Sequence, residues 1–449
     1  MSKEPIRFKQ TEIGELPEEW EVKPLSDVLL DSQSGEWGKD VKEFNPDLHE
    51  PVRIIRSTEF TKDCRLLLGT AAERAIPKKK AAKILLQEGD ILVERSGGGP
   101  TQPVGRVIFV EKLPEGNWGF GNFIQRLRVK PEYHPRYIWA VLFWHWLKGS
   151  VLAMQEQTTG IRNLRWSDYL NLPIPLPPLE EQKRIAGVLR LVDRVSEETR
   201  RIISIYERAK KFALKRLLTR GIGHTRFKQT EIGELPEEWE VVRLEDVARV
   251  FSGSSAPQGR EYFENGIFPF VRVQDLARYG QTRCLTEVTD KVNERAVQEH
   301  HMVLARKGTI LFPKSGAALE KNHRAILGVD AYIVSHLAAV EANPEKGDNE
   351  FLFWWLCRID MTSLNPNPGY PSIRLKEIKN LTIPLPSLEE QKQIAEMLGT
   401  IDSAIENEMR YLGVLEKFKR WLLYNLLTGK IRLPSKIDDI LKEVLTDAS

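Results

Sequence analysis

Two long helical segments with nearly identical proline-rich approaches constrain this chain more than any other feature. Residues 172–186 read LPIPLPPLEEQKRIA, and residues 381–395 read LTIPLPSLEEQKQIA, 209 positions later. Proline fixes φ and disfavours the α conformation in the residue before it, so each approach is expected to be extended. Each helix is expected to begin where the prolines end, because a Glu-Glu pair there suits the positive end of the helix dipole.

Behind each approach, apolar residues recur at heptad spacing for about 40 residues. The first copy has one set at Ile185, Val192, Thr199, Tyr206 and Ala213, a second set at Val188, Val195, Ile202 and Ala209, and further apolar residues at Leu189, Ile203 and Leu217. The second copy repeats the first set as Ile394, Ile401, Leu415 and Leu422, and the second set as Met397, Ala404, Tyr411 and Phe418. Such a narrow seam requires a partner helix. One copy alone also fits a core helix, but two copies predict two rods on the order of 60 Å that pair antiparallel.

The whole chain is a tandem duplication. Residues 7–22 read RFKQTEIGELPEEWEV and recur without change as residues 226–241, an offset of 219 instead of 209. The first variable segment is therefore ten residues longer than the second, so one scaffold carries two different globular domains. We predict a first head at 1–171 with its approach and helix at 172–220, a second head at 221–380 with its approach and helix at 381–430, and a short polar tail at 431–449 with an amphipathic turn.

Both heads show the same order of expected elements. The first head has strand patterns at 52–56, 90–94, 107–110 and 123–129, and an aromatic-rich helix at 137–147. In the second head, residues 268–272, 308–316 and 332–340 correspond to 52–56, 89–97 and 123–129, and residues 351–356 correspond to the aromatic helix. Each head is thus expected to be mixed α/β with irregular loops.

Composition excludes several classes of function. The chain has 449 residues, a hydrophobic share of 41%, a charged share of 29% and a net charge of only +3, as expected of a soluble globular protein. Its three cysteines are far apart, which argues against a structural zinc site and for a reducing cytoplasm. No signal peptide, membrane-spanning run, activated nucleophile or acidic metal cluster is evident, so we predict a cytoplasmic chain with no catalytic site, no bound cofactor and no membrane partner.

The candidate binding residues are polar side chains at corresponding places in the two heads. Arg95 and the Gly/Pro-rich residues 96–105 lack the Gly-Lys-Ser/Thr of a phosphate-binding loop, and a simple spacer is the alternative reading. Arginine and glutamine can nonetheless contact both phosphates and base edges. Taken singly, each candidate fits a solvated surface position, but together they outline a basic face on each head. In the first head they are Arg53, Arg56, Arg95, Ser96, Gln102, Arg106, Arg162 and Arg165. In the second head they are Arg272, Gln274, Lys314, Ser315, Lys321, Arg324 and Arg374.

These motifs resemble one known family. They resemble the specificity (S) subunit of type I restriction–modification systems, across essentially the whole chain. The motifs that carry the resemblance are the two helix starts PPLEEQ and PSLEEQ, the GDILVERSG at 89–97 and the repeated IGELPEEW. The resemblance implies two target-recognition domains held apart by two long antiparallel coiled-coil helices with pseudo-two-fold symmetry. The second head departs from the pattern, because GTILFPKSG replaces GDILVERSG. Whether Lys314 does what Arg95 does is therefore left open.

The resemblance also implies a function and partners. Each domain would read one half of a bipartite site in double-stranded DNA, and helix length would set the unread spacer. Two modification (methyltransferase) subunits would bind the chain, and restriction–translocase subunits would join through them. S-adenosylmethionine, ATP and Mg²⁺ would belong to those partners. The competing interpretations are a DNA methyltransferase or nuclease with its own site, and a protein–protein scaffold or inhibitor without a DNA role.

Overall fold

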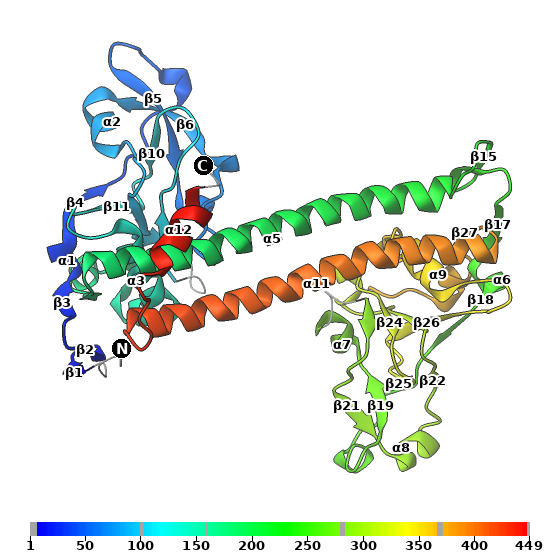
Figure 1. Cartoon of the computed structure of the whole chain (residues 1–449). Coiled ribbons are helices and arrows are strands. Elements are labelled where there is room, and N and C mark those ends of the chain that lie inside the picture. The colour runs from blue at the N-terminus through cyan, green and yellow to red at the C-terminus, as the bar shows by residue number, and fades with distance from the viewer. Residues whose placement is uncertain (1–6, 99–102, 159, 279–282, 366–370, 447–449) are drawn as a thin grey trace. The chain divides into compact units, whose positions relative to one another are not determined.

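The chain is a mixed α/β protein made of two compact units. Figure 1 shows the computed structural model, which describes residues 7–98, 103–158, 160–278, 283–365 and 371–446. The first unit contains Met1–Glu197 and Gly413–Ser449, and the second contains Glu198–Leu412. Each unit therefore holds one head together with a stretch of both long helices.

The long helices have the predicted bounds. Helix α5 spans Leu179–Arg220 and helix α11 spans Leu388–Leu427. Their approaches are extended, as strands β14 (Pro173–Leu176) and β27 (Thr382–Leu385). Each approach forms a two-stranded antiparallel ribbon, with β3 (Glu21–Pro24) and β17 (Glu240–Arg243) respectively. Two-stranded ribbons tolerate proline because a strand edge does not need every N–H group.

The two helices pair antiparallel in both units. In the first unit Lys419 of α11 lies 2.5 Å from the Asp193 carboxylate of α5. In the second unit Lys210 of α5 pairs with Asp402 of α11. Because early residues of one helix meet late residues of the other, the prediction of antiparallel pairing is confirmed.

Only half of the predicted seam is correct. Ile185, Val192 and Ile394 of the first set are buried. Val188 of the second set packs against the core, but the rest of that set was wrong, because residues such as Ile202 and Tyr411 are exposed and other residues alternate with the first set. Those residues are Leu189, Ser196, Ile203 and Leu217 on α5, and Leu398, Ile405 and Leu426 on α11. Steps of three and of four residues both stay on one helical face, so only the partner helix decides which side is covered.

The first head is built from three small sheets and an aromatic helix. The largest has the strand order β4-β11-β7-β9, with bounds Leu29–Ser34, Ile124–Val129, Ile91–Glu94 and Val107–Phe109. A second has the order β10-β5-β6, with bounds Trp118–Phe120, His49–Ile55 and Ala72–Pro77. A third has the order β12-β13-β8, with bounds Gln155–Thr158, Ile161–Leu164 and Ser96–Gly97. The predicted strand positions and the aromatic helix, now α3 (Pro135–Leu147), are confirmed.

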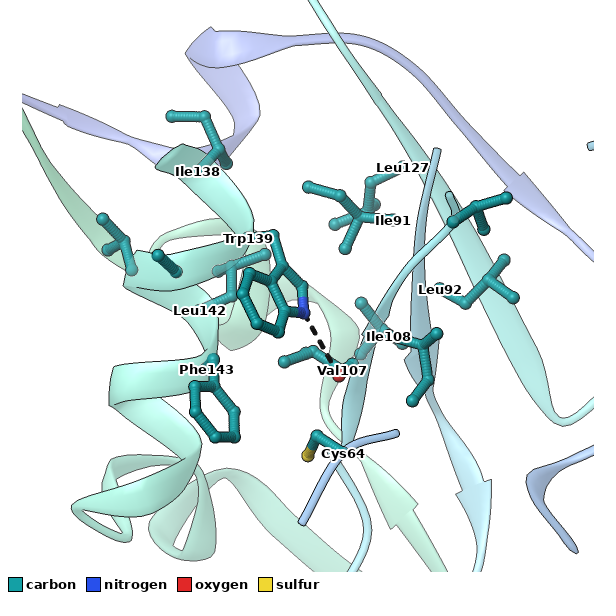
Figure 2. Close-up of a cluster of buried hydrophobic side chains, with 14 of the residues drawn as sticks. Cys64, Ile91, Leu92, Val107, Ile108, Leu127, Ile138, Trp139, Leu142 and Phe143 are labelled. Carbon is teal, nitrogen blue, oxygen red and sulfur yellow. Dashed lines mark hydrogen bonds between the residues drawn. The ribbon is translucent and has the colours of Figure 1, made fainter. Parts of the chain in front are cut away.

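Helix α3 packs its aromatic side chains onto the largest sheet. Figure 2 shows Trp139 and Phe143 facing the strand that carries Val107, and the indole Nε1 of Trp139 donates to the Val107 carbonyl at 3.3 Å. Cys64 lies in the same cluster, and burial raises the pKa of its thiol to about 12. A thiol held neutral in this way serves as a packing group.

The second head repeats the strand order of the largest sheet. Its first sheet has the order β18-β26-β23-β24-β20, with bounds Ala248–Ser252, Leu337–Ala342, Ile310–Pro313, Ala325–Leu327 and Cys284–Leu285. Its second sheet has the order β21-β19-β25-β22, with bounds Asp290–Val292, Phe268–Val271, Ala331–Ile333 and Leu304–Ala305. The predicted aromatic helix is α9 (Asn349–Leu356).

One expected strand of the second head is two strands. The predicted strand at 332–340 divides into β25 and β26, which belong to different sheets. The chain turns between them, where the Leu337 N–H donates to the Val334 carbonyl at 3.0 Å. A tight turn within an apolar run is invisible to a pattern that scores hydrophobicity alone.

Short elements complete both units. The repeated sequence forms the same hairpin twice, as β1 and β2 (Phe8–Thr11, Gly14–Pro17) and as β15 and β16 (Phe227–Thr230, Gly233–Pro236). The short α-helices are α1 (Leu25–Val28), α2 (Lys78–Ile84), α4 (Trp166–Leu170), α6 (Leu244–Val247), α7 (Val273–Arg278), α8 (Glu294–Glu299) and α10 (Leu375–Lys379). The 3₁₀ turns are Val41–Glu43, Ser57–Glu59, Leu68–Thr70, Ser150–Met154, Arg260–Tyr262, Leu319–Lys321 and Met361–Leu364.

The expected polar tail contains a ten-residue helix. Helix α12 (Ile437–Thr446) lies against α5 (Figure 1), and its Leu441 is buried against Gly187. Arg184 of α5 holds Asp438 through two hydrogen bonds of 2.8 and 2.9 Å. The amphipathic turn predicted from the sequence is thus a docked helix.

Candidate nucleic-acid interface

In the first head, the predicted loop after β7 meets the segment just before α4. The Leu164 N–H donates to the Arg95 carbonyl at 2.8 Å, and β8 pairs with β13 so that Ser96 lies opposite Asn163. Arg162 lies opposite Gly97 in the same ladder. Residues almost 70 positions apart are therefore brought to one surface.

A polar depression of about 480 Å³ lies at this junction. Its lining includes Arg95, Ser96 and Arg165, together with residues that the sequence analysis did not select. Those further residues are Asn122, Glu156, Asn163, Leu164, Trp166 and Ser167. The Arg95 guanidinium lies 5.9 Å from the centre of the Trp166 ring, which favours a cation–π contact. Amide, hydroxyl and guanidinium groups are the donors and acceptors that contact phosphates and base edges.

The second head has the same construction with different side chains. The Ile373 N–H donates to the Lys314 carbonyl at 2.8 Å, and Ser315 is bridged to Ser372. Lys314 therefore occupies the position of Arg95, and Ser315 that of Ser96. Ser315 is buried and hydrogen-bonds Nδ1 of His336 at 2.7 Å.

A second depression of about 480 Å³ lies beside His336. Of the predicted residues, it brings together Arg272, Gln274 and Lys321. It adds His323 and His336, which the sequence analysis did not select. Scattered histidines gave no signal, because they become neighbours only when the strand ends meet.

Arg56 and Arg272 hold equivalent positions, each directly after the first strand of the parallel pair. The backbone N–H of Arg56 donates to the Glu59 carboxylate at 2.6 Å, and that of Arg272 donates to Asp275 at 2.8 Å. Arg56 also holds Glu59 by a side-chain ion pair of 2.7 Å. Burial by itself raises the pKa of Glu59, but the hydrogen bonds from Arg56 and Thr70 outweigh it, so the pKa of Glu59 is lowered. Glu59 therefore stays ionised and fixes the orientation of the Arg56 side chain.

The side chains of the other candidates near these strands differ in their exposure and in their contacts. Arg53 is exposed on β5 and lies 5.5 Å from the Trp118 ring. The Arg272 side chain pairs with Asp290. Arg165 and Arg374 are equivalent N-cap residues of α4 and α10, and both are exposed.

Arg106 and Arg324 are bound by the protein's own groups, Arg106 buried and Arg324 half-buried, and one candidate is not described. Arg106 is buried and binds the Glu94 carboxylate at 2.6 and 2.8 Å. Arg324 donates to the carbonyl and side-chain oxygens of Asn322 at 2.9 and 3.0 Å, and burial lowers the pKa of Arg324. Gln102 lies outside the described residues.

The buried Arg106–Glu94 pair yields a stability prediction. Replacing Arg106 with alanine leaves the Glu94 carboxylate buried and unpaired, so we expect the free energy of unfolding to fall by about 3–5 kcal/mol. Urea denaturation followed by tryptophan fluorescence measures this loss. Lys80→Ala is the matched control, since its ion pair with Glu36 is exposed and is expected to contribute less than about 1 kcal/mol. Similar small losses in both variants would contradict a structural role for the buried pair.

Among the described residues, neither a metal-binding cluster nor a membrane-spanning helix accompanies these surfaces. Across residues 7–446, leaving out the gaps in the description, no three His, Cys, Asp or Glu side chains converge to hold a metal ion. Within the same ranges, no helix combines the length and apolar character needed to cross a bilayer.

Two heads of one topology, each with a polar depression that carries cationic side chains and each on an antiparallel helix pair, define a duplicated binding protein. The chain belongs to the family of DNA specificity subunits of type I restriction–modification systems. The family model for the type I restriction modification DNA specificity domain matches it twice, at residues 17–206 and 236–417.

Similar proteins agree with this assignment. The chain is 31% identical over 431 residues to the putative type I restriction enzyme MjaX specificity subunit of Methanocaldococcus jannaschii, covering 95% of this chain and 97% of that protein. It is 29% identical over 435 residues to the MjaVIII specificity subunit of the same organism, covering 95% and 96%. The crystal structure of the S subunit from M. genitalium shares the fold with a TM-score of 0.58 at 17% identity, covering 91% and 96% of the two chains.

Proposed function

We propose that this chain is the DNA sequence-recognition subunit of a type I restriction–modification complex, in which each head reads one half of a bipartite, asymmetric DNA site. One observation carries the proposal. Equivalent strand ends present different side chains in the two heads, with Arg95 in one and Lys314 in the other. The same frame with unlike contact groups suits two half-sites of different sequence.

In this proposal the chain supplies recognition and its partners supply the chemistry. The described residues contain no candidate metal-binding cluster. We infer that S-adenosylmethionine, ATP and Mg²⁺ are bound by the modification and restriction–translocase subunits. The chain itself is then non-catalytic, and it acts by placing its partners on a chosen sequence.

The outward faces of the long helices support docking of two modification subunits. α5 exposes Ile202, Ile205 and Phe212, and 209 positions later α11 exposes the outer-face residues Tyr411, Val414 and Trp421. We call these two sets the outer stripes. Phe212 is 66% exposed and Trp421 is 50% exposed. Large apolar groups at helical spacing on a solvent face are typical of a helix-binding surface. Because each repeat carries one outer stripe, the duplication suits two copies of one partner.

Methylome sequencing of a host that expresses this chain with its modification partner tests the proposal. We expect a two-part methylated motif with a fixed gap, which would identify both half-sites at once. A continuous motif would argue against two independent reading heads. No methylation, with both subunits present and bound to each other, would favour a scaffold without a DNA role.

The outer stripes yield a prediction about stoichiometry. The wild-type chain is expected to bind two modification subunits, while Phe212→Glu or Trp421→Glu is expected to bind one and the double variant none. A charge in the centre of an apolar contact costs at least about 2 kcal/mol, or roughly thirtyfold in affinity. Native mass spectrometry of the purified complex counts the copies.

The control for this prediction is Ile267→Glu. Ile267 is 68% exposed but belongs to the second head and to neither outer stripe, so two copies should remain bound. Single stripe variants that still carry two modification subunits would contradict the assignment of the stripes.

A further inference from the structure

A charged cluster in the first unit joins three segments of the chain. Lys419 of α11 lies 2.5 Å from Asp193 of α5, and Asp193 also accepts from Arg136 of α3 at 3.2 Å. Arg136 belongs to the first head. The Lys419 ammonium group lies over the rings of Trp139 and Phe143, at 5.3 and 4.6 Å from their centres. Both long helices and the head are therefore held at one point.

The second unit contains an equivalent cluster. Lys210 and Asp402 correspond to Lys419 and Asp193 in the 209-residue repeat, with the two helices exchanging roles. Lys210 lies 5.1 Å from the centre of the Trp354 ring of α9. Here Arg283 replaces Arg136, with its Nε 4.0 Å from Asp402 and its backbone N–H donating to Glu406 at 3.0 Å.

The two arginines come from unrelated parts of their heads. Arg136 lies on the aromatic helix, whereas Arg283 directly precedes β20. Arg136 hydrogen-bonds Asp193, whereas Arg283 pairs with Glu350 of α9 and lies beside the repeat-equivalent Asp402 at 4.0 Å. The lysine–aspartate pair thus belongs to the shared scaffold, and each variable head connects to it by its own arginine.

The position of the lysines argues for a role beyond stability. Lys210 lies between Ile203 and Leu217 in the heptad set that is buried on α5, and Lys419 lies at the equivalent place on α11. A lysine at such a position is less stabilising than leucine, but it specifies a single register of the helix pair. Both ion pairs are partly buried, and ion pairs shielded from water contribute little net stability, so specification of register is their best-attested role.

We propose that the Lys419–Asp193 and Lys210–Asp402 pairs, each with its head arginine, are positioning residues that fix where each head sits along its stretch of the helix pair. The inference rests on the proposed function. If helix length sets the unread gap, a head held at one axial position permits one gap only. A head released from its aspartate, or a helix pair free to shift, would accept neighbouring gaps.

The test is methylome sequencing of a Lys210→Leu/Lys419→Leu chain expressed with its modification partner. We expect both half-sites unchanged, while methylation at gaps one base pair shorter or longer rises from background to roughly a tenth of that at the native gap. Thermal unfolding should shift downward, because Asp193 and Asp402 lose their lysine partners and keep only the nearby Arg136 and Arg283. A purely structural role predicts a stability change without new gaps.

The second variant pair is Asp193→Asn/Asp402→Asn, which keeps the shape of the side chain and removes the charge. It decides the question if the leucine variant does not fold, and it is expected to broaden the gap in the same way. Lys80→Leu, which removes only an exposed pair inside the first head, serves as control and should keep the native gap. Retention of the single native gap, altered half-site bases, or loss of all methylation by a folded variant would each overturn the proposal. Absence of a two-part motif in the wild-type sample would instead overturn the proposed function.

Discussion

A chain with one extra heptad in each long helix is expected to methylate the same two half-sites across a longer gap. Suitable insertions are second copies of residues 195–201 in α5 and of residues 404–410 in α11. Both lie midway between the two lysine–aspartate pairs and keep the seam in phase. Seven residues add about 10 Å of helix, which corresponds to at most about three base pairs of DNA.

This experiment separates the effect of helix length on the gap from the effect of the heads on the half-site bases. Methylome sequencing with the modification partner reports the gap and the half-site bases in one measurement. A chain with the insertion in α5 alone is the control, because its seam loses alignment with α11 and methylation should be lost. An unchanged gap in the doubly inserted chain would refute the idea that helix length sets the spacer.

Substitution of Arg95 by alanine is expected to change recognition of one half-site and leave the other intact. Arg95 lines the depression of the first head beside Trp166. A guanidinium that contacts a base edge contributes about 1–3 kcal/mol of discrimination, so methylation of the preferred half-site should fall roughly 5- to 150-fold relative to its single-base variants. Methylation rates on a set of DNA duplexes with one changed base pair measure this directly.

Two matched variants sharpen the result. Lys314 occupies the equivalent position in the second head, so Lys314→Ala should affect only the other half-site. Arg95→Lys keeps the charge but loses the two-pronged hydrogen bonding, so it should retain affinity and lose base discrimination. Equal loss at both half-sites after Arg95→Ala, or none at either, would count against Arg95 as a reading residue.

The prediction from sequence succeeded where local chemistry decides the structure. The prolines of both approaches produced strands β14 and β27, and the Glu-Glu pairs mark the first turns of α5 and α11. The repeat also predicted that Lys314 would stand where Arg95 stands, and the hydrogen bonds from Leu164 and Ile373 have the same 2.8 Å length in both heads. Segments that differ in side chains but share the same backbone pairing fold in the same way.

It failed where a side chain's surroundings come from distant segments. Arg106 follows a glycine-rich loop and looks like a surface arginine, yet it is buried because Glu94 and the carbonyls of Ser57 and Phe60 surround it. His323 and His336 carry no local signal, yet they line the same depression as Arg272. The residues adjacent in sequence to Arg106, His323 and His336 do not indicate which distant residues contact them in the folded chain.

The sequence by itself determined the duplication, the two long helices, their antiparallel pairing and the correspondence between the heads, because these follow from repeat spacing and backbone preference. Only the tertiary structure decided which of two heptad sets, Leu189 and Ile203 or Ile202 and Ala209, faces the partner helix, and which arginines face solvent. Both alternatives satisfy the same helical periodicity. Burial depends on contacts between segments that are distant in sequence. Which residues are buried is therefore decided only when the helices and heads pack.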